Sequence, residues 1–182
     1  MQFSKAGLDG LWLIEPVHKY DQRGFFARTF CVDEYGQHGL ETNFVQHSVS
    51  YSRLSGTLRG LHFQLGPYAE VKVVSCLKGA IWDVVVDLRP DSPSYCLWAG
   101  FDLTAQNRRQ LYIPQGFAHG FQCLCDDVEV SYLISRTYAP DAASGVRFDD
   151  PAFGVRWPLS PTVMSEADRN WPYFDHSRHE GS

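Results

Sequence analysis

Ile81-Trp82-Asp83-Val84-Val85-Val86-Asp87-Leu88 is the most apolar stretch of the chain. Its β-branched and aromatic residues, bounded by turn-forming residues, predict a buried β-strand. Similar runs cover residues 71–75, 97–103, 110–113 and 128–135, separated by short segments rich in Gly, Pro, Asp or Asn. No helical segments alternate with these runs, which argues against a doubly wound parallel sheet. The sequence therefore predicts an antiparallel all-β protein of the jelly-roll barrel type.

Helical periodicity is confined to short pieces at the periphery of this predicted barrel. One covers Val32 to His38 and another Ser165 to Arg169, where Ser165 is placed to cap the helix. With 182 residues, 44% of them hydrophobic and 14% aromatic, the chain has the size and composition of one folded domain. We expect that domain over residues 1–175, followed by a polar tail over residues 176–182.

The charge pattern limits the partners that the chain can have. Sixteen basic and 21 acidic residues give a net charge of −5, without a block of Lys or Arg. This argues against a general nucleic-acid binder. Charged residues interrupt the first apolar segment, and no run is long enough to span a membrane, so we expect a cytoplasmic protein. The five cysteines are an odd number without zinc-site spacing and predict reduced thiols.

Polar side chains interrupt several of the predicted strands. Strand alternation places Asp83 and Asp87 on one face, where buried carboxylates need His, Lys or Arg partners. In residues 57–64, Thr-Leu-Arg-Gly-Leu-His-Phe-Gln, alternation places His62 on one face and Arg59 on the other. Lys72 lies in an otherwise apolar strand, and His119 follows a Pro-Gly turn.

Each of these residues alone fits a structural role, such as a hydrogen-bonded core histidine or an edge lysine. Together they can converge in the mouth of one small barrel, which is the usual form of a ligand site. A metal centre is the less favoured reading. Pro114-x-Gly116-x-x-His119 resembles half of the metal-binding cupin motif, but Gln64 stands where a second His is expected. Lys72 beside Glu70 would also repel a divalent cation, so we expect no metal.

A set of linked motifs covers the chain from about residue 10 to 175. They are Asp21 to Phe26, Phe44-Val45-Gln46, Leu58 to Gln64, Lys72, Asp83 to Arg89, Arg109 to Phe121, Tyr132, Tyr138-Ala139-Pro140, Asp149-Asp150-Pro151 and Trp157-Pro158. In this order they resemble the dTDP-4-dehydrorhamnose 3,5-epimerases and their sugar-nucleotide relatives. The resemblance implies a cupin-type jelly roll and epimerisation of a nucleotide-linked 4-keto-6-deoxyhexose.

The resemblance also implies the catalytic residues. His62 resembles the base that removes the proton next to the keto group, and Asp168 the carboxylate paired with it. Lys72 is similar to the cation that stabilises the enolate oxygen. Tyr132 matches the acid that returns a proton from the opposite face. Such chemistry requires neither cofactor nor metal.

Further residues are implied in substrate binding. Arg23 and Arg59 resemble the residues that hold the diphosphate, for which a guanidinium fork is suited. Phe26 and Tyr138 would supply stacking surface for base and sugar. Gln46 is also implied as a binding residue. The resemblance places His119 and Asp83 in the same cavity as orienting groups. It also implies a homodimer, in which Arg59 could serve a pocket shared between subunits.

Several positions depart from the family pattern. They are Arg28, the stretch Gln46-His47-Ser48-Val49-Ser50, Ser75 and Leu133. We expect these positions to contact nucleotide or sugar, so they leave open whether C3, C5 or both carbons are inverted. Double 3,5-epimerisation is the leading prediction. The alternatives are a single-site epimerase of a related dTDP-4-keto deoxysugar and a non-catalytic nucleotide-sugar binding cupin.

Overall fold

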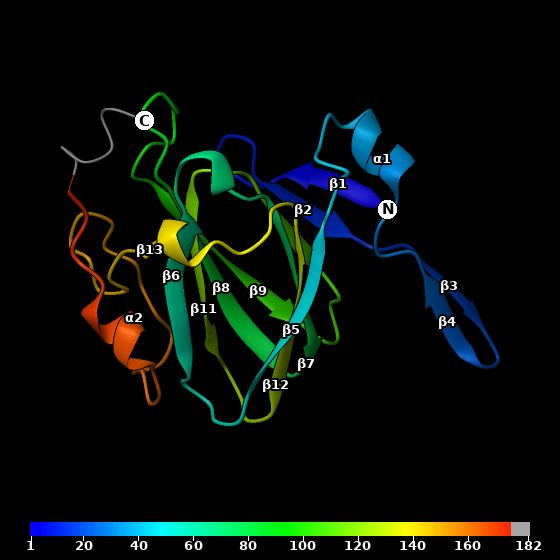
Figure 1. The fold of residues 1–182 in the computed structure, drawn as a ribbon. Coiled ribbons are helices and arrows are strands. Elements are labelled where there is room, and N and C mark those ends of the chain that lie inside the picture. Colours follow the sequence, from blue (N-terminus) through cyan, green and yellow to red (C-terminus); the bar gives the residue numbers. More distant parts are fainter. Residues whose placement is uncertain (176–182) are drawn as a thin grey trace.

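Two antiparallel sheets face each other in the computed structural model, which describes residues 1–175 (Figure 1). The six-stranded sheet has the order β1 (Gln2–Lys5), β2 (Trp12–Glu15), β10 (Gln110–Ile113), β7 (Lys72–Lys78), β12 (Val128–Ile134) and β5 (Gln46–Ser52). The five-stranded sheet has the order β13 (Ala143–Gly145), β6 (Leu58–Gln64), β11 (Phe117–Cys123), β8 (Ala80–Asp87) and β9 (Trp98–Thr104). The predicted jelly roll is confirmed.

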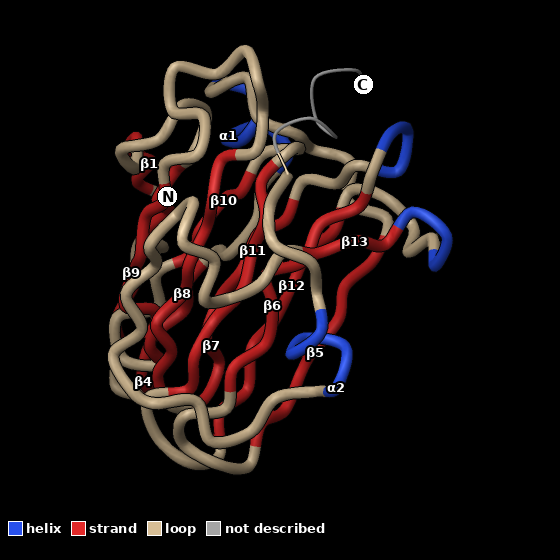
Figure 2. The backbone as a smooth tube through the Cα atoms, turned by 90° about the vertical axis from the view of Figure 1, so that its left-hand side faces the viewer, coloured by secondary structure: helices blue, strands red, loops and turns tan. Residues whose placement is uncertain are grey.

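Short helices lie at the edges of these layers (Figure 2). They are α1 (Val32–Gln37), α2 (Glu166–Asn170) and the 3₁₀ turns η1 (Gly66–Tyr68) and η2 (Pro140–Ala142). Both predicted helices are confirmed, and the Ser165 side chain accepts a hydrogen bond from the Asp168 backbone, as expected of an N-cap. None of the helices in residues 1–175 has the length and apolar character needed to cross a bilayer. The predicted polar tail lies outside the described residues.

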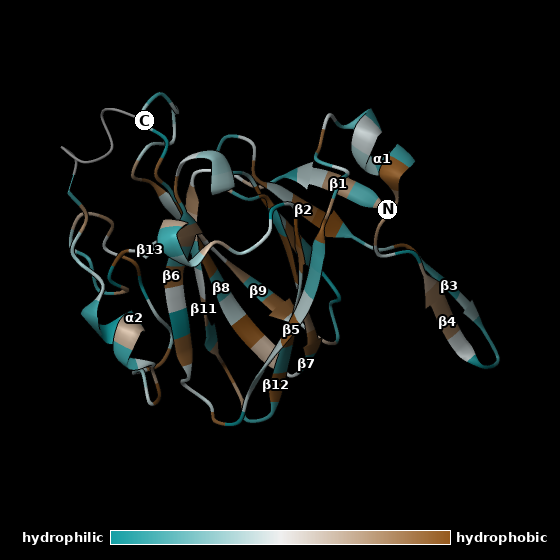
Figure 3. Cartoon of the chain, in the orientation of Figure 1, coloured by the Kyte–Doolittle hydropathy of each residue, from teal (hydrophilic) through white to brown (hydrophobic). Residues whose placement is uncertain are grey.

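The hydrophobic residues concentrate on the central strands (Figure 3), and β8 shows why its sequence is so apolar. Val85 faces the space between the sheets, where it packs with Val74 and Phe121. Val84 and Val86 face the opposite side, which the C-terminal segment covers with Phe153 and its neighbours. A strand buried on both faces loses the usual alternation of apolar and polar residues.

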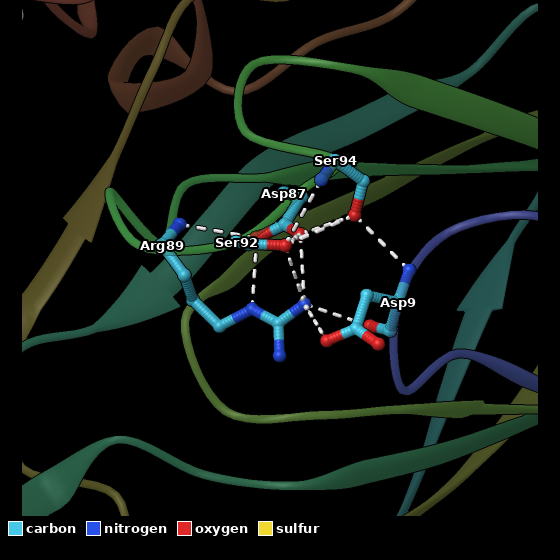
Figure 4. Close-up of polar contacts among 5 residues, drawn as sticks. All are labelled: Asp9, Asp87, Arg89, Ser92 and Ser94. Carbon is cyan, nitrogen blue, oxygen red and sulfur yellow. Dashed lines mark hydrogen bonds and ion pairs between the residues drawn. The ribbon is translucent and has the colours of Figure 1, made fainter.

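Asp87 ends β8 in a buried polar cluster (Figure 4). Its carboxylate accepts hydrogen bonds from the Arg89 guanidinium at 2.7 and 2.9 Å and from Ser94 at 2.6 Å, and Ser92 is a further donor. Burial alone would raise the pKa of Asp87, but these hydrogen bonds outweigh it, and the pKa lies below its usual value. The expectation that the buried Asp87 carboxylate has a cationic partner is confirmed.

We expect Asp87→Asn to lower the free energy of unfolding by about 3 kcal/mol, because it removes one partner of a buried ion pair. The pKa is lowered in the folded state, so the stabilisation is complete above the ordinary value of 3.8 and is lost as the pH falls through the folded-state value. Urea denaturation at pH 7 and in the acid range measures both effects. An Asp87→Asn chain as stable as the parent at pH 7 would contradict this account.

The hairpin of β3 (His18–Asp21) and β4 (Gly24–Ala27) projects from the body, on the side opposite α2 (Figure 1). Phe26 is 70% exposed on it, and Arg23 forms an ion pair with Asp21 in the turn. Exposed aromatic residues on a projecting hairpin are unusual for a surface that contacts only water.

Candidate active site

One end of the space between the two sheets is polar. His62 of β6 and His119 of β11 are directly paired, and so their side chains share the interior face of the five-stranded sheet. Lys72 of β7 and Tyr132 of β12 project from the interior face of the six-stranded sheet, beside Val74 of the core. Four of the predicted site residues therefore face each other across the sandwich.

His62 and Asp168 form a close pair. The imidazole Nε2 lies 2.5 Å from Asp168 Oδ1, and Asp168 is buried at the start of α2. Burial alone would raise the pKa of this carboxyl, but hydrogen bonds from His62 and from the Trp171 indole outweigh it and lower the pKa. The His62 side chain is 44% exposed, so the carboxylate fixes the ring from behind while the cavity side stays open.

Lys72 lies in a cavity of about 350 Å³ beside His62. Its ammonium is 2.7 Å from the Glu70 carboxylate, and both side chains are largely buried. Gln46 and Tyr138 line the same cavity, and the Gln46 side chain accepts a hydrogen bond from the Tyr138 backbone.

Tyr132 is half-buried on β12. Its hydroxyl lies 3.0 Å from Ser50 Oγ, and its ring stands edge-on to His119 with centroids 6.5 Å apart. Burial raises the pKa of this phenol, which keeps the proton on its oxygen at neutral pH. His119 in turn is 2.8 Å from the buried Asp83, which confirms the expectation that Asp83 has a basic partner.

The structure corrects the predicted direction of Arg59. Strict alternation places Arg59 on the face opposite His62, but the register between β6 and β11 shifts at this point. Arg59 pairs with Phe121 and so joins the interior face. Gly60 and Gly120 permit this close approach, because a Cβ on Gly60 would lie 2.6 Å from the Gly120 Cα.

Of the predicted binding residues, Gln46 and Tyr138 line this cavity, whereas Arg59, His119, Asp83, Arg23 and Phe26 do not. Arg23 and Phe26 belong to the projecting hairpin, on the far side of the body from α2 (Figure 1). The positions that depart from the family pattern also differ from expectation. His47 is hydrogen-bonded to Ser131 on the outer side of the six-stranded sheet. Leu133 packs on the same outer side, in the hydrophobic cluster that contains Val73 and Tyr112. Neither lines the cavity within this chain.

Sequence reasoning missed three cavity residues: Glu70 as the partner of Lys72, Arg136 and Trp171. Glu70 was visible as the same-face neighbour of Lys72, whereas no motif pointed to Arg136 or Trp171. Among residues 1–175, no three His, Cys, Asp or Glu side chains are grouped so that they could hold a metal ion. The cysteines of the chain are free thiols.

Comparison with known proteins decides the family. The family model of dTDP-4-dehydrorhamnose 3,5-epimerase matches residues 5–176. The chain belongs to this family. The dTDP-4-dehydrorhamnose 3,5-epimerase of Methanothermobacter thermautotrophicus is 44% identical over 173 residues, covering 93% of this chain and 92% of the relative.

Two further relatives of this epimerase-family chain are a 3,5-epimerase and a 3-epimerase. The crystal structure of the 3,5-epimerase from Bacillus anthracis with TDP and PPi bound is 40% identical, has a TM-score of 0.92, and the match covers 95% of this chain and 99% of that one. A dTDP-4-dehydrorhamnose 3-epimerase of Streptomyces niveus is 35% identical over 182 residues, covering 100% of this chain and 87% of the relative.

Proposed function

We propose that this chain is a cofactor-independent epimerase of a nucleotide-linked 4-keto-6-deoxyhexose. The leading substrate is dTDP-4-dehydro-6-deoxyglucose, inverted at C3 and C5 to give dTDP-4-dehydrorhamnose. One observation carries the proposal: His62 on one sheet, paired with Asp168 of α2, faces Lys72 and the half-buried Tyr132 on the other sheet.

The keto group at C4 acidifies the hydrogens on the neighbouring carbons C3 and C5. His62, with its ring held by Asp168, removes such a proton as a general base. The electrons of the broken C–H bond move toward the keto oxygen and form an enolate. The Lys72 ammonium supports the proposal, because a cation aimed at this oxygen stabilises the developing charge.

Inversion needs a proton from the opposite face of the enolate. Tyr132 belongs to the sheet that faces His62, and its raised pKa keeps its proton available. A sugar between the sheets would lose a proton to His62 on one side and gain one from Tyr132 on the other. His119, paired with Asp83, orients the sugar from the same interior face.

The nucleotide would lie toward the rim of the cavity, where Tyr138 is exposed and Gln46 holds its backbone. We also propose a cytoplasmic homodimer in which the hairpin bearing Arg23 and Phe26 completes the site of the partner subunit. The exposure of that hairpin and of Val49 on the edge strand β5 supports such a contact.

Mixing two inactive variants tests the shared site. We expect Arg23→Gln and His62→Ala chains, each impaired alone, to regain activity when they are unfolded together and refolded as mixed dimers. One site of a mixed dimer then combines an intact His62 with an intact hairpin. Activity that stays at the sum of the two separate preparations would contradict a shared site, and light scattering checks that dimers form.

Product analysis tests the proposed reaction. With dTDP-4-dehydro-6-deoxyglucose, we expect proton NMR to show the product inverted at both C3 and C5. The similarity to a 3-epimerase makes inversion at C3 alone the second candidate. Binding of the substrate without any new sugar species would instead indicate a non-catalytic binding protein.

A further inference from the structure

The charged side chains of the cavity form an ordered row. The backbones of Val71 and Ser135 are joined by a hydrogen bond of 3.0 Å that extends the pairing of β7 with β12. The next residues, Glu70 and Arg136, therefore stand opposite each other, just beyond Lys72 and Ile134. All four line the cavity that contains His62.

Arg136 has no carboxylate partner within the described part of the chain, although several other arginines do. Glu70, its cross-strand neighbour, places Oε1 2.7 Å from the Lys72 ammonium instead. The other oxygen of Glu70 is buried and has no hydrogen-bond partner, so it does not engage Arg136 either. The row thus carries two cations and one anion, and the uncompensated positive charge belongs to Arg136.

The Arg136 guanidinium is also only partly used as a donor. One terminal nitrogen donates to the Ser135 carbonyl at 3.1 Å. The remaining N–H groups have no partner among residues 1–175, and they offer the paired donors that suit phosphate oxygens.

The order of residues along the cavity matches the order of groups in the proposed substrate. In the proposed function Lys72 faces the keto oxygen, and Tyr138 lies at the rim of the cavity, where the base is proposed to stack. Arg136 lies between them, about 6.5 Å further along the strand direction than the Lys72 position. A hexose separates its C4 oxygen from the phosphate on C1 by a similar length.

Arg59 differs from Arg136 in that its guanidinium already has partners within the chain. It does not line the cavity, and its guanidinium donates to Ser52 Oγ at 3.1 Å and to the Tyr51 carbonyl at 2.9 Å. It lies beyond His62 on β6, away from Tyr138. We propose that Arg136 binds the diphosphate of the substrate, an inference that rests on the proposed function.

Calorimetric titration of the full chain with TDP and with thymidine separates phosphate binding from base binding. We expect Arg136→Gln to raise the Kd for TDP by about 10- to 100-fold, because a charge-assisted hydrogen-bonded contact is lost. The Kd for thymidine should stay within about twofold of the parent value. Arg136→Lys should fall between, because it keeps the charge but loses the fork.

Arg156→Gln is the matched control, since Arg156 is exposed and outside the cavity, and it should change neither affinity. An unchanged Kd for TDP in Arg136→Gln would overturn the inference, as would equal weakening of TDP and thymidine. Failure of the unsubstituted chain to bind TDP would instead contradict the proposed function.

A second measurement applies if Arg136→Gln does not fold. In the unsubstituted chain labelled with ¹⁵N-arginine, the Arg136 Nε–Hε signal, assigned through Arg136→Lys, should shift with TDP and not with thymidine. If the chain binds TDP and the Arg136 Nε–Hε signal does not shift, the inference is overturned.

Discussion

His62→Ala should lower turnover by about 10²- to 10⁴-fold while the affinity for the nucleotide sugar changes little. In the proposed reaction the His62 imidazole, paired with Asp168, is the base, and alanine leaves no group that can accept the proton. Steady-state kinetics combined with titration of the substrate at low temperature separates the loss of chemistry from any loss of binding.

Asp168→Asn is the companion variant. It keeps the shape of the side chain but removes the carboxylate that orients the ring and stabilises its charged form, so its turnover should fall between those of His62→Ala and the parent. Near-normal turnover of His62→Ala would remove this residue from the role of base.

Tyr132→Phe should lower the rate of product formation by about 10²- to 10⁴-fold, yet leave much of the exchange of sugar hydrogens with solvent. In the proposed reaction the phenol supplies the proton that completes inversion, whereas His62 on the facing sheet would still remove and return a proton on its own side. Proton NMR in D₂O measures both rates in the same sample.

Ser50→Ala is the matched control for this prediction, because Ser50 is the hydrogen-bond partner of the Tyr132 hydroxyl. It should keep most of the turnover if the phenol itself is the acid. An equal loss of exchange and product formation in Tyr132→Phe would show instead that the ring only shapes the cavity.

Much of the fold could be predicted from local sequence. The run at residues 81–88 corresponds to β8 (Ala80–Asp87), and residues 110–113 are β10. The predicted runs at 71–75, 97–103 and 128–135 correspond to β7, β9 and β12 with shifted ends. Short strands such as β1 and β13 were not identified, because their partly exposed residues lack a clear apolar pattern.

The face on which a site residue lies could be predicted where it follows from alternation along its own strand. It was harder to predict where it depends on the register with a neighbouring strand. Alternation grouped Lys72 with Glu70 and Val74 on one face, and the structure shows that this is the interior face. For Arg59 alternation gave the wrong face, because a register shift against β11 changes it. Arg136 was not identified from the sequence. The proposal for it rests on the absence of a carboxylate partner among residues 1–175, and that absence can be seen only in the packed structure.

The most direct test of the account is the exchange of hydrogens at C3 and C5 of dTDP-4-dehydro-6-deoxyglucose, followed separately by proton NMR in D₂O with the unsubstituted chain. The account predicts deuterium at both carbons of the product without any added cofactor. It also predicts that His62→Ala loses this exchange. Formation of the inverted product with its original hydrogens retained would contradict proton abstraction through an enolate.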